Sequence, residues 1–367
     1  MKVGCPKEIK NNEFRVGLTP NAVRAYVKFG HSVFVEEGAG IGSAIADDEY
    51  KAAGAVMLSS AEEIWDTVDM IVKVKEPLKT EYGRMKENQI IYTYFHFAAN
   101  KSLLDACIKQ KIISIAYETV QEGKTLPLLK PMSEVAGRMS VLMGGFYSAR
   151  TQKGRGLLPM GVTGVAPANI VIIGGGSVGT NAARVAAGFG ANVTVLDINL
   201  ERLEYLDEIL PANVKSIYND DVTLENYLKE ADIVIGAVLV PGAKSPKLVR
   251  HDHLKKMKKG AILVDVAIDQ GGCFETSRPT SHDEPIFIVD DIIHYCVANM
   301  PGAYARTSTF ALNNATIKYG LELASNGIEE ACRKNRALFL GLNTYKGDIT
   351  YPGVAQAFDM PIKKISL

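Results

Sequence analysis

The N-terminal third of the chain alternates between short apolar runs and amphipathic stretches. Runs rich in β-branched and aromatic residues predict strands at residues 2–4, 31–35, 70–74, 89–95 and 112–117. The intervening stretches have the apolar spacing of helices, at residues 21–29, 47–53, 82–87 and 101–109. Strands that alternate with helices in this way predict a parallel sheet covered by helices.

A second series of the same kind begins near Ala168. Its predicted strands are residues 170–173, 193–196, 231–240 and 261–268, and its first helix is 178–188. We therefore predict an α/β fold with two doubly wound, Rossmann-like domains, each built on a parallel sheet.

Two long helical stretches flank the second series and are expected to join the domains. The first, at about 131–150, is interpreted as a helix capped by Ser133, and the second is about 307–326. The two predicted domains are a discontinuous one, formed by residues 1–130 together with 306–367, and a second one formed by residues 131–305.

Composition narrows the classes of partner. Lys and Arg number 41 and Asp and Glu number 41, so the sequence lacks the basic excess of a protein that binds nucleic acid or an anionic membrane. It has neither a long apolar span nor an apolar signal core, which predicts a cytoplasmic protein with small-molecule or subunit partners. Five cysteines without a CxxC pair favour reduced, buried thiols. His251 and His253 have HxH spacing in a polar segment, and we expect no metal site there.

A glycine motif follows the first strand of the second series. Gly174, Gly176 and Gly179 form GxGxxG, with Gly174 suited to a tight turn, Gly176 to close approach of a pyrophosphate and Gly179 to close helix–strand packing. Asp197 ends the next strand, where a carboxylate meets ribose hydroxyls and repels a 2′-phosphate. The motif predicts a dinucleotide cofactor, NAD rather than NADP, although Arg202 weakens that preference. A similar run at residues 38–42 lacks the third glycine and is interpreted as a turn.

Polar residues at the carboxyl ends of the predicted strands are the candidates for chemistry, because ligands of open α/β sheets bind there. Arg15 follows the first strand through a short loop, Lys75 follows the third and His96 follows the fourth, and Asp269 ends the strand 261–268 of the second domain. Arg and Lys would hold a carboxylate and polarise a carbonyl or imine, and His exchanges protons near neutrality. An anionic 2-amino or 2-oxo acid suits a cleft lined by these four.

Each candidate also has a structural alternative that the sequence leaves open. Arg15 and Lys75 are ordinary residues for a solvated loop, and His96 lies in a sequence context that suits an aromatic core. Asp265 is a rival of Asp269, but a carboxylate in mid-strand is more typical of a buried, hydrogen-bonded group than of a reactive one.

Blocks along the whole chain resemble the bacterial NAD-dependent L-alanine dehydrogenases, relatives of the nucleotide-binding part of proton-translocating transhydrogenases. The matching blocks are residues 10–16 (KNNEFRV), 72–77 (VKVKEP), 132–138 (MSEVAGR), 236–244 (GAVLVPGAK), 265–273 (DVAIDQGGC) and 297–301 (VANMP). The resemblance implies reversible oxidative deamination of L-alanine to pyruvate and ammonium, with hydride passing to the nicotinamide. It also implies that residues 1–130 with 306–367 form a substrate domain, that residues 131–305 form an inserted NAD-binding domain, and that the protein is a homo-oligomer, commonly a hexamer.

The resemblance assigns roles to residues at matching positions. It implies that Arg15 and Lys75 bind the substrate and that His96 and Asp269 are the catalytic pair. The expected cofactor contacts are Ser133, Gly174, Gly176, Ser177, Val178, Gly179, Asp197, Arg202, Val238, Leu239, Val266, Ala267, Ile268, Asp269, Arg278, Val297, Ala298, Asn299 and Met300. Two alternatives remain, a transhydrogenase-type subunit and a catalytically silent NAD-sensing module.

Overall fold

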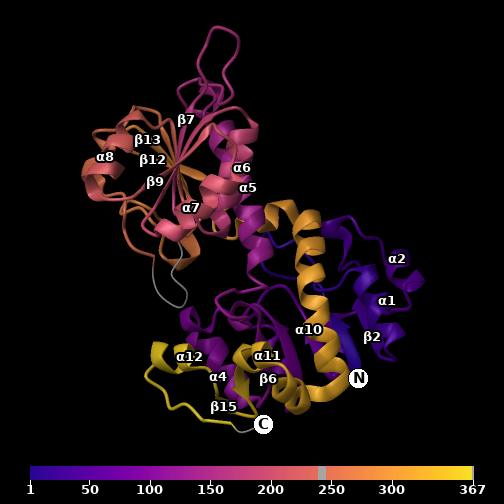
Figure 1. The fold of residues 1–367 in the computed structure, drawn as a ribbon. Coiled ribbons are helices and arrows are strands. Elements are labelled where there is room, and N and C mark those ends of the chain that lie inside the picture. The colour runs from indigo at the N-terminus through magenta and orange to yellow at the C-terminus, as the bar shows by residue number, and fades with distance from the viewer. Residues whose placement is uncertain (239–244, 366–367) are drawn as a thin grey trace. The chain divides into compact units, whose positions relative to one another are not determined.

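The computed structural model describes residues 1–238 and 245–365. The chain divides into two compact units (Figure 1). Unit 1 comprises Met1–Met132 and Gly302–Leu367, and unit 2 comprises Ser133–Pro301. Helix α5 (Lys130–Tyr147) runs from the first unit into the second, and the chain returns to unit 1 just before helix α10 (Ala305–Lys334).

Unit 1 is built on an eight-stranded sheet in the order β15-β14-β6-β5-β4-β1-β2-β3. Its strands are β1 (Lys2–Cys5), β2 (Ser32–Glu36), β3 (Val56–Leu58), β4 (Met70–Val72), β5 (Ile90–Thr93), β6 (Ile113–Ala116), β14 (Leu342–Tyr345) and β15 (Asp348–Ile349). The first six are parallel to one another, whereas β14 is antiparallel to both β6 and β15. The carboxyl ends of six parallel strands therefore share one edge of this sheet.

Helices cover both faces of this sheet, as the βαβ alternation predicts. They are α1 (Pro20–Lys28), α2 (Asp47–Ala52), α3 (Ala61–Thr67), α4 (Lys101–Lys109), α10, α11 (Arg336–Gly341) and α12 (Pro352–Ala357). Ile64 of α3 and Leu104 of α4 pack in one apolar cluster with Ile71 and Ile91 of the sheet. On the other face, the Tyr92 hydroxyl donates to the Thr316 carbonyl of α10 at 3.1 Å.

The predicted elements of unit 1 are mostly present, with three differences. Residues 82–87 do not form the expected α-helix, because only a single 3-10 turn forms there (Tyr82–Arg84). Strand β3 and helix α3 were not predicted, and three strand residues are too few to show an alternating pattern in the sequence. Helix α10 continues past residue 326, but Gly327 interrupts it with φ 73° and ψ 168°.

Unit 2 is built on a seven-stranded sheet in the order β12-β13-β11-β10-β7-β8-β9. The strands are β7 (Asn169–Ile173), β8 (Asn192–Asp197), β9 (Val214–Tyr218), β10 (Ile233–Gly236), β11 (Ile262–Asp265), β12 (Ile286–Val289) and β13 (Ile292–Tyr295). All neighbouring pairs are parallel except β12 with β13. The two sheets confirm the expectation of two mostly parallel, Rossmann-like units.

The helices of unit 2 are the main part of α5, α6 (Ser177–Gly188), α7 (Leu200–Ile209), α8 (Asp221–Glu230) and α9 (His251–Leu254). Two apolar clusters divide them between the faces of the sheet, with α5 and α6 in one and α8 and α9 in the other. Gly137 of α5 permits a close helix crossing, because a Cβ there would lie 2.2 Å from the Val178 carbonyl oxygen of α6. The helix begins at Lys130, so Ser133 lies within it and is not its cap as predicted.

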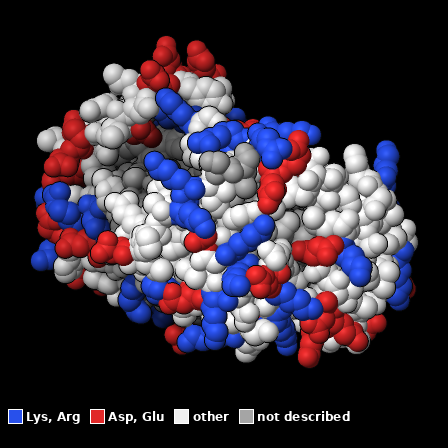
Figure 2. Space-filling model, turned by 90° about the horizontal axis from the view of Figure 1, so that it is seen from below, with Lys and Arg blue, Asp and Glu red and all other residues white. Residues whose placement is uncertain are grey.

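Charge on the surface is mixed in sign. Figure 2 shows acidic and basic side chains interspersed over the face in view, in keeping with 41 residues of each sign in the sequence. Among the helices of the described residues, none combines the length and the apolar character needed to cross a bilayer.

Candidate functional site

Three candidate residues lie beyond strand ends of unit 1. Arg15 is in the loop between β1 and α1, Lys75 follows β4 and His96 follows β5. Backbone groups beside Arg15 are fixed by α10, since the Thr309 hydroxyl accepts from the Val16 amide at 3.2 Å and the Asn313 side chain accepts from the Thr19 amide at 2.8 Å. The fold of unit 1 thus places the three residues at one edge of its sheet.

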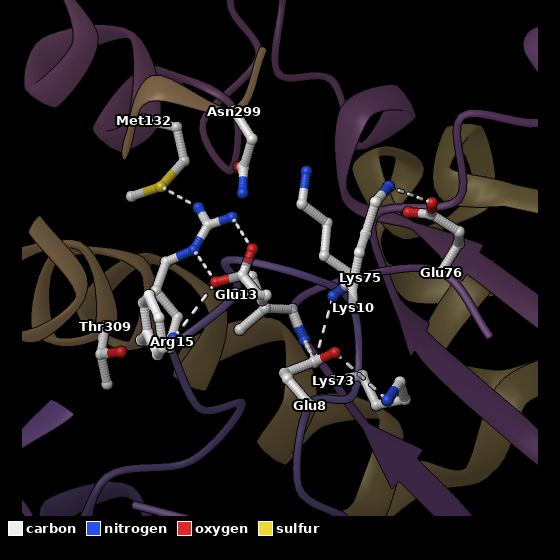
Figure 3. Close-up of polar contacts among 12 residues, drawn as sticks. Glu8, Lys10, Glu13, Arg15, Lys73, Lys75, Glu76, Met132, Asn299 and Thr309 are labelled. Atoms are coloured by element: carbon white, nitrogen blue, oxygen red, sulfur yellow. Dashed lines mark hydrogen bonds and ion pairs between the residues drawn. The ribbon is translucent and has the colours of Figure 1, made fainter. Parts of the chain in front are cut away.

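Arg15 is buried, with 2% of its surface exposed, so the solvated-loop alternative is wrong. Its Nε and Nη2 donate to the two carboxylate oxygens of Glu13 at 2.6 and 2.5 Å, and its Nη1 donates to the Met132 sulfur at 3.0 Å (Figure 3). Burial by itself would lower the pKa of Arg15, but the Glu13 carboxylate raises it. Glu13 therefore balances the charge of Arg15 and occupies one edge of its guanidinium group.

Lys75 is also buried, at 8% exposed, which again contradicts the surface alternative. No described residue forms a hydrogen bond or ion pair with its ammonium group, whereas neighbouring Lys10 is paired with Glu76 (Figure 3). Burial lowers the pKa of Lys75, and the charge of nearby Arg15 lowers it further. Lys75 is thus a cation held largely out of water and available to an anionic ligand.

A buried set of charges supports the strand end that carries Lys75. Glu8 accepts the Val74 and Lys75 amides at 2.6 and 3.2 Å, and its other oxygen lies 3.2 Å from the Lys73 ammonium. Lys73 also contacts Glu81 at 3.1 Å, and both charges raise its pKa against the opposing effect of burial. Burial raises the pKa of Glu8. This set fixes the backbone of Lys75 rather than its side chain.

His96 has an exposed side chain and an unusual backbone. Its φ of 50° and ψ of 39° lie in the left-handed region, which costs free energy for a residue other than glycine. The Glu118 carboxylate stabilises this turn by accepting the His96 amide at 2.6 Å, and the imidazole stacks on Tyr94 with ring centres 5.9 Å apart. His96 is therefore not buried in the aromatic core, although its imidazole packs against Tyr94.

The glycine loop of unit 2 has the geometry that the motif predicts. Gly174 has φ 99°, and a Cβ on Gly179 would lie 1.8 Å from the Gly174 carbonyl oxygen, so both positions require glycine. A Cβ on Gly176 would meet nothing within 4 Å, and Gly176 precedes the first turn of α6. The loop leaves open space beside a helix N-terminus, which is the arrangement that binds a pyrophosphate.

Asp197 and Arg202 both contact this loop. Asp197, the last residue of β8, accepts the Gly175 amide at 2.6 Å and the Asn199 amide at 2.9 Å. Arg202 donates from Nε to the Gly175 carbonyl and from Nη2 to the Thr180 hydroxyl, both at 2.5 Å. The Arg202 guanidinium is thus hydrogen-bonded to the glycine loop and to the first turn of α6.

The other cofactor candidates of unit 2 also follow strand ends. Val238 follows β10, residues 266–269 follow β11, and residues 297–300 follow β13, all at the edge where β7 ends. Arg278 stacks on Phe287 and lines a cavity of about 310 Å³ with Thr280 and Glu284. Ser133 is half-buried in α5, and Leu239 lies outside the described residues.

The two acidic rivals have different environments. Asp265 is fully buried and accepts from the Ala267, Cys273 and Phe274 amides and from the Ser277 hydroxyl, as a structural carboxylate does, and burial raises its pKa. Asp269 is exposed in a 3-10 turn (Ile268–Gln270) and does not end the strand, because β11 stops at Asp265. Whether Asp269 acts with His96 stays a prediction.

Three supporting carboxylates, Glu8, Glu13 and Glu118, were not predicted from the sequence. Glu118 follows β6 as His96 follows β5, so the strand-end rule could have found it. Glu13 is two residues from Arg15, but sequence proximity alone does not predict a bidentate ion pair. Glu8 reaches Lys73 across 65 residues, and no local pattern signals that contact.

Comparisons with known proteins agree along the whole chain. The family models for the alanine dehydrogenase/PNT N-terminal and C-terminal domains match residues 4–136 and 140–352. The chain belongs to the alanine dehydrogenase/PNT family. It is 53% identical over 367 residues to Alanine dehydrogenase 2 of Staphylococcus aureus (strain USA300), covering 100% of this chain and 98% of the relative.

Solved structures of the family have the same fold. An L-alanine dehydrogenase matches with a TM-score of 0.95 and 48% identity over 98% of this chain and 99% of the other. A transhydrogenase from Sinorhizobium meliloti matches with a TM-score of 0.82 over 96% and 99% of the two chains, and at 24% identity it shows the fold alone. Family membership, the fold class and an enzyme of this family are thereby confirmed.

Proposed function

We propose that this member of the alanine dehydrogenase/PNT family catalyses the reversible, NAD-dependent oxidative deamination of L-alanine to pyruvate and ammonium. The observation that supports the proposal most is the buried Lys75 ammonium, whose charge no described residue pairs. A substrate carboxylate or carbonyl oxygen is the partner that such a cation lacks. The identity of 53% to an alanine dehydrogenase favours alanine as the amino acid.

In this proposal unit 1 is the substrate domain. Lys75 binds the substrate and polarises its carbonyl or imine carbon, so that its stabilising effect grows as charge develops in the reaction. Arg15, held by Glu13, contributes hydrogen bonds more than net charge. His96 accepts a proton during deamination and returns it during amination, which an exposed imidazole at the sheet edge can do.

Unit 2 is the proposed NAD domain, and its residues suit a dinucleotide. The open space at Gly176 and the start of α6 would hold the pyrophosphate, and the Asp197 carboxylate would face the ribose and disfavour a 2′-phosphate. NAD, when bound, accepts the hydride from the substrate carbon. Asp269 is proposed to orient water and to balance the charge of the substrate iminium group. The other proposed cofactor contacts are Ser133, Ser177, Val178, Gly179, Arg202, Val238, Leu239, Val266, Ala267, Ile268, Arg278, Val297, Ala298, Asn299 and Met300.

The direct test follows nicotinamide absorbance with a panel of L-amino acids and with NAD and NADP. We expect alanine to be the best substrate and NAD to be preferred by at least about tenfold in kcat/KM. Asp197→Ala should narrow that preference, and His96→Ala and Asp269→Asn should each lower turnover by about a hundredfold with little change in NAD affinity. NAD binding without turnover of any amino acid would instead indicate an NAD-sensing module.

We also propose a cytoplasmic homo-oligomer, with a hexamer as the expected form. Large apolar side chains are exposed on unit 2, at Leu142 and Phe146 of α5 and at Leu158, Val162 and Val165 of the following segment. Such side chains favour association with further copies of the chain, and closed symmetric assemblies are the usual result. Light scattering at micromolar concentration should give a mass well above 39.8 kDa, and a monomer would contradict the proposal.

A further inference from the structure

The charged groups around Lys75 form two balanced pairs and one unbalanced cation. Glu13 neutralises Arg15, and Glu76 neutralises Lys10, whereas no described residue pairs with the Lys75 ammonium. These same four residues are the charges that shift the pKa of Lys75 after the effect of burial. The carboxylates of Glu8 and Glu81 are occupied by Lys73 and by backbone amides.

Glu13 holds a central place in this arrangement. It is 5% exposed, and both of its oxygens contact Arg15, so it brings a full negative charge to the place where the substrate is proposed to bind. Glu13 also raises the pKa of Lys75. A charge that is so deeply buried acts on its neighbours with little screening by water.

We propose that Glu13 determines the charge of the acid that this site accepts. This inference rests on the proposed function and adds to it how the site selects acids with one negative charge over acids with two. With Glu13 present, Arg15 contributes donors without net charge, and Lys75 alone offers a charge to the ligand. A monoanion meets that one charge, whereas a dianion brings a second negative charge toward the Glu13 carboxylate and is rejected.

Oxamate and oxalate provide the test, because they resemble pyruvate and each other in size but carry one and two negative charges at neutral pH. Both are measured as competitive inhibitors against pyruvate, with saturating NADH and ammonium. We expect the unaltered enzyme to bind oxamate more tightly than oxalate. Glu13→Gln should shift the ratio of the two inhibition constants toward oxalate by at least about tenfold, since one buried negative charge is removed.

Two control variants separate charge from structure. Glu13→Asp keeps the negative charge and should keep the preference for oxamate. Glu81→Gln removes another buried carboxylate, one that pairs with Lys73 and not with Arg15, and it should leave the ratio unchanged. If Glu13 were only structural, Glu13→Gln would weaken both inhibitors equally, and that result would overturn the inference.

The pH profile gives a second readout. Glu13 raises the pKa of Lys75, so in Glu13→Gln the Lys75 ammonium should lose its proton at a lower pH. The decrease of kcat/KM for pyruvate at alkaline pH should then begin at a lower pH in Glu13→Gln, whereas Glu81→Gln should leave it unchanged. If Glu13→Gln fails to fold, the unaltered enzyme still decides, because oxalate binding as tight as that of oxamate contradicts the inference. Absence of pyruvate turnover in the unaltered enzyme would defeat the proposed function itself, which keeps the two failures distinct.

Discussion

The candidate sites of the two units use different chemistry. In unit 1 most of the groups are buried charged side chains, paired with one another except for Lys75, and they come from segments as far apart as Glu8 and Lys73. In unit 2 the site is a turn of backbone, Gly174 to Gly179, whose shape excludes a side chain at Gly174 and Gly179 and leaves open space at Gly176. A site formed by consecutive backbone groups can be recognised from the spacing of its glycines in the sequence, whereas a site formed by charges from distant segments has no such motif.

The largest expected effect is a difference between two lysines of unit 1, one needed for stability and the other for turnover. Lys73→Met should lower the free energy of unfolding by about 3–5 kcal/mol, because Glu8 and Glu81 would remain buried without their cation. Lys75→Met should leave stability unchanged or higher, since an unpaired buried ammonium is removed, but it should lower turnover by about a hundredfold.

Guanidinium denaturation and steady-state kinetics on the same preparations check this contrast. Equal losses of stability in both variants would show that Lys75 is a structural cation like Lys73. The distinction between supporting and ligand-facing charges in unit 1 would then be wrong.

The second prediction concerns acid stability in unit 2. His294 is fully buried and stacks on Phe287, and burial lowers its pKa to about 4. The unfolded chain binds the proton more readily, so unfolding becomes easier as pH falls from about 6.5 to about 4, by on the order of 3 kcal/mol. His294→Gln should lose correspondingly less stability over this range.

Denaturation midpoints measured near pH 7 and near pH 4 test the prediction. His251→Gln is the comparison variant, because His251 is exposed on the same unit and its contact with Asp290 lies at the surface, so its removal should change stability by less than about 1 kcal/mol. Parallel curves for His294→Gln and the unaltered protein would show that His294 does not contribute.

The third prediction compares two glycines of the loop. Gly179→Ala places a Cβ against the Gly174 carbonyl and should destabilise the protein by about 2 kcal/mol or more. Gly176→Ala meets no atom within 4 Å and should keep the stability of the fold while weakening NAD binding, because the new methyl group enters the proposed pyrophosphate space. Thermal unfolding and calorimetric titration with NADH separate the two effects, and unchanged NADH affinity in Gly176→Ala would place the pyrophosphate elsewhere.

Much of the fold could be predicted because it depends on local periodicity. The prediction of residues 101–109 as a helix coincides with α4, and the strands around the glycine motif agree with β7 and β8 within one residue. The errors lie where local signals are weak, as at β3 with its three residues, and at residues 82–87, where only the 3-10 turn Tyr82–Arg84 forms. The exposed position of Asp269 beyond β11 was missed because the apolar run continues past the last strand residue.

The sequence by itself determined the two α/β series, the glycine turn and the identity of the strand-end residues, since each depends on neighbours a few positions apart. Only the tertiary structure decided which charges are paired. Arg15, Lys73 and Lys75 carry the same charge and cannot be distinguished in the sequence. In the structure all three are buried, where pairing matters most, and Glu13 pairs with Arg15 while Glu8 and Glu81 pair with Lys73. Chain segments that meet only on folding thus leave Lys75 as a buried cation without an ion-pair partner among the described residues, which is why it is proposed to bind the substrate.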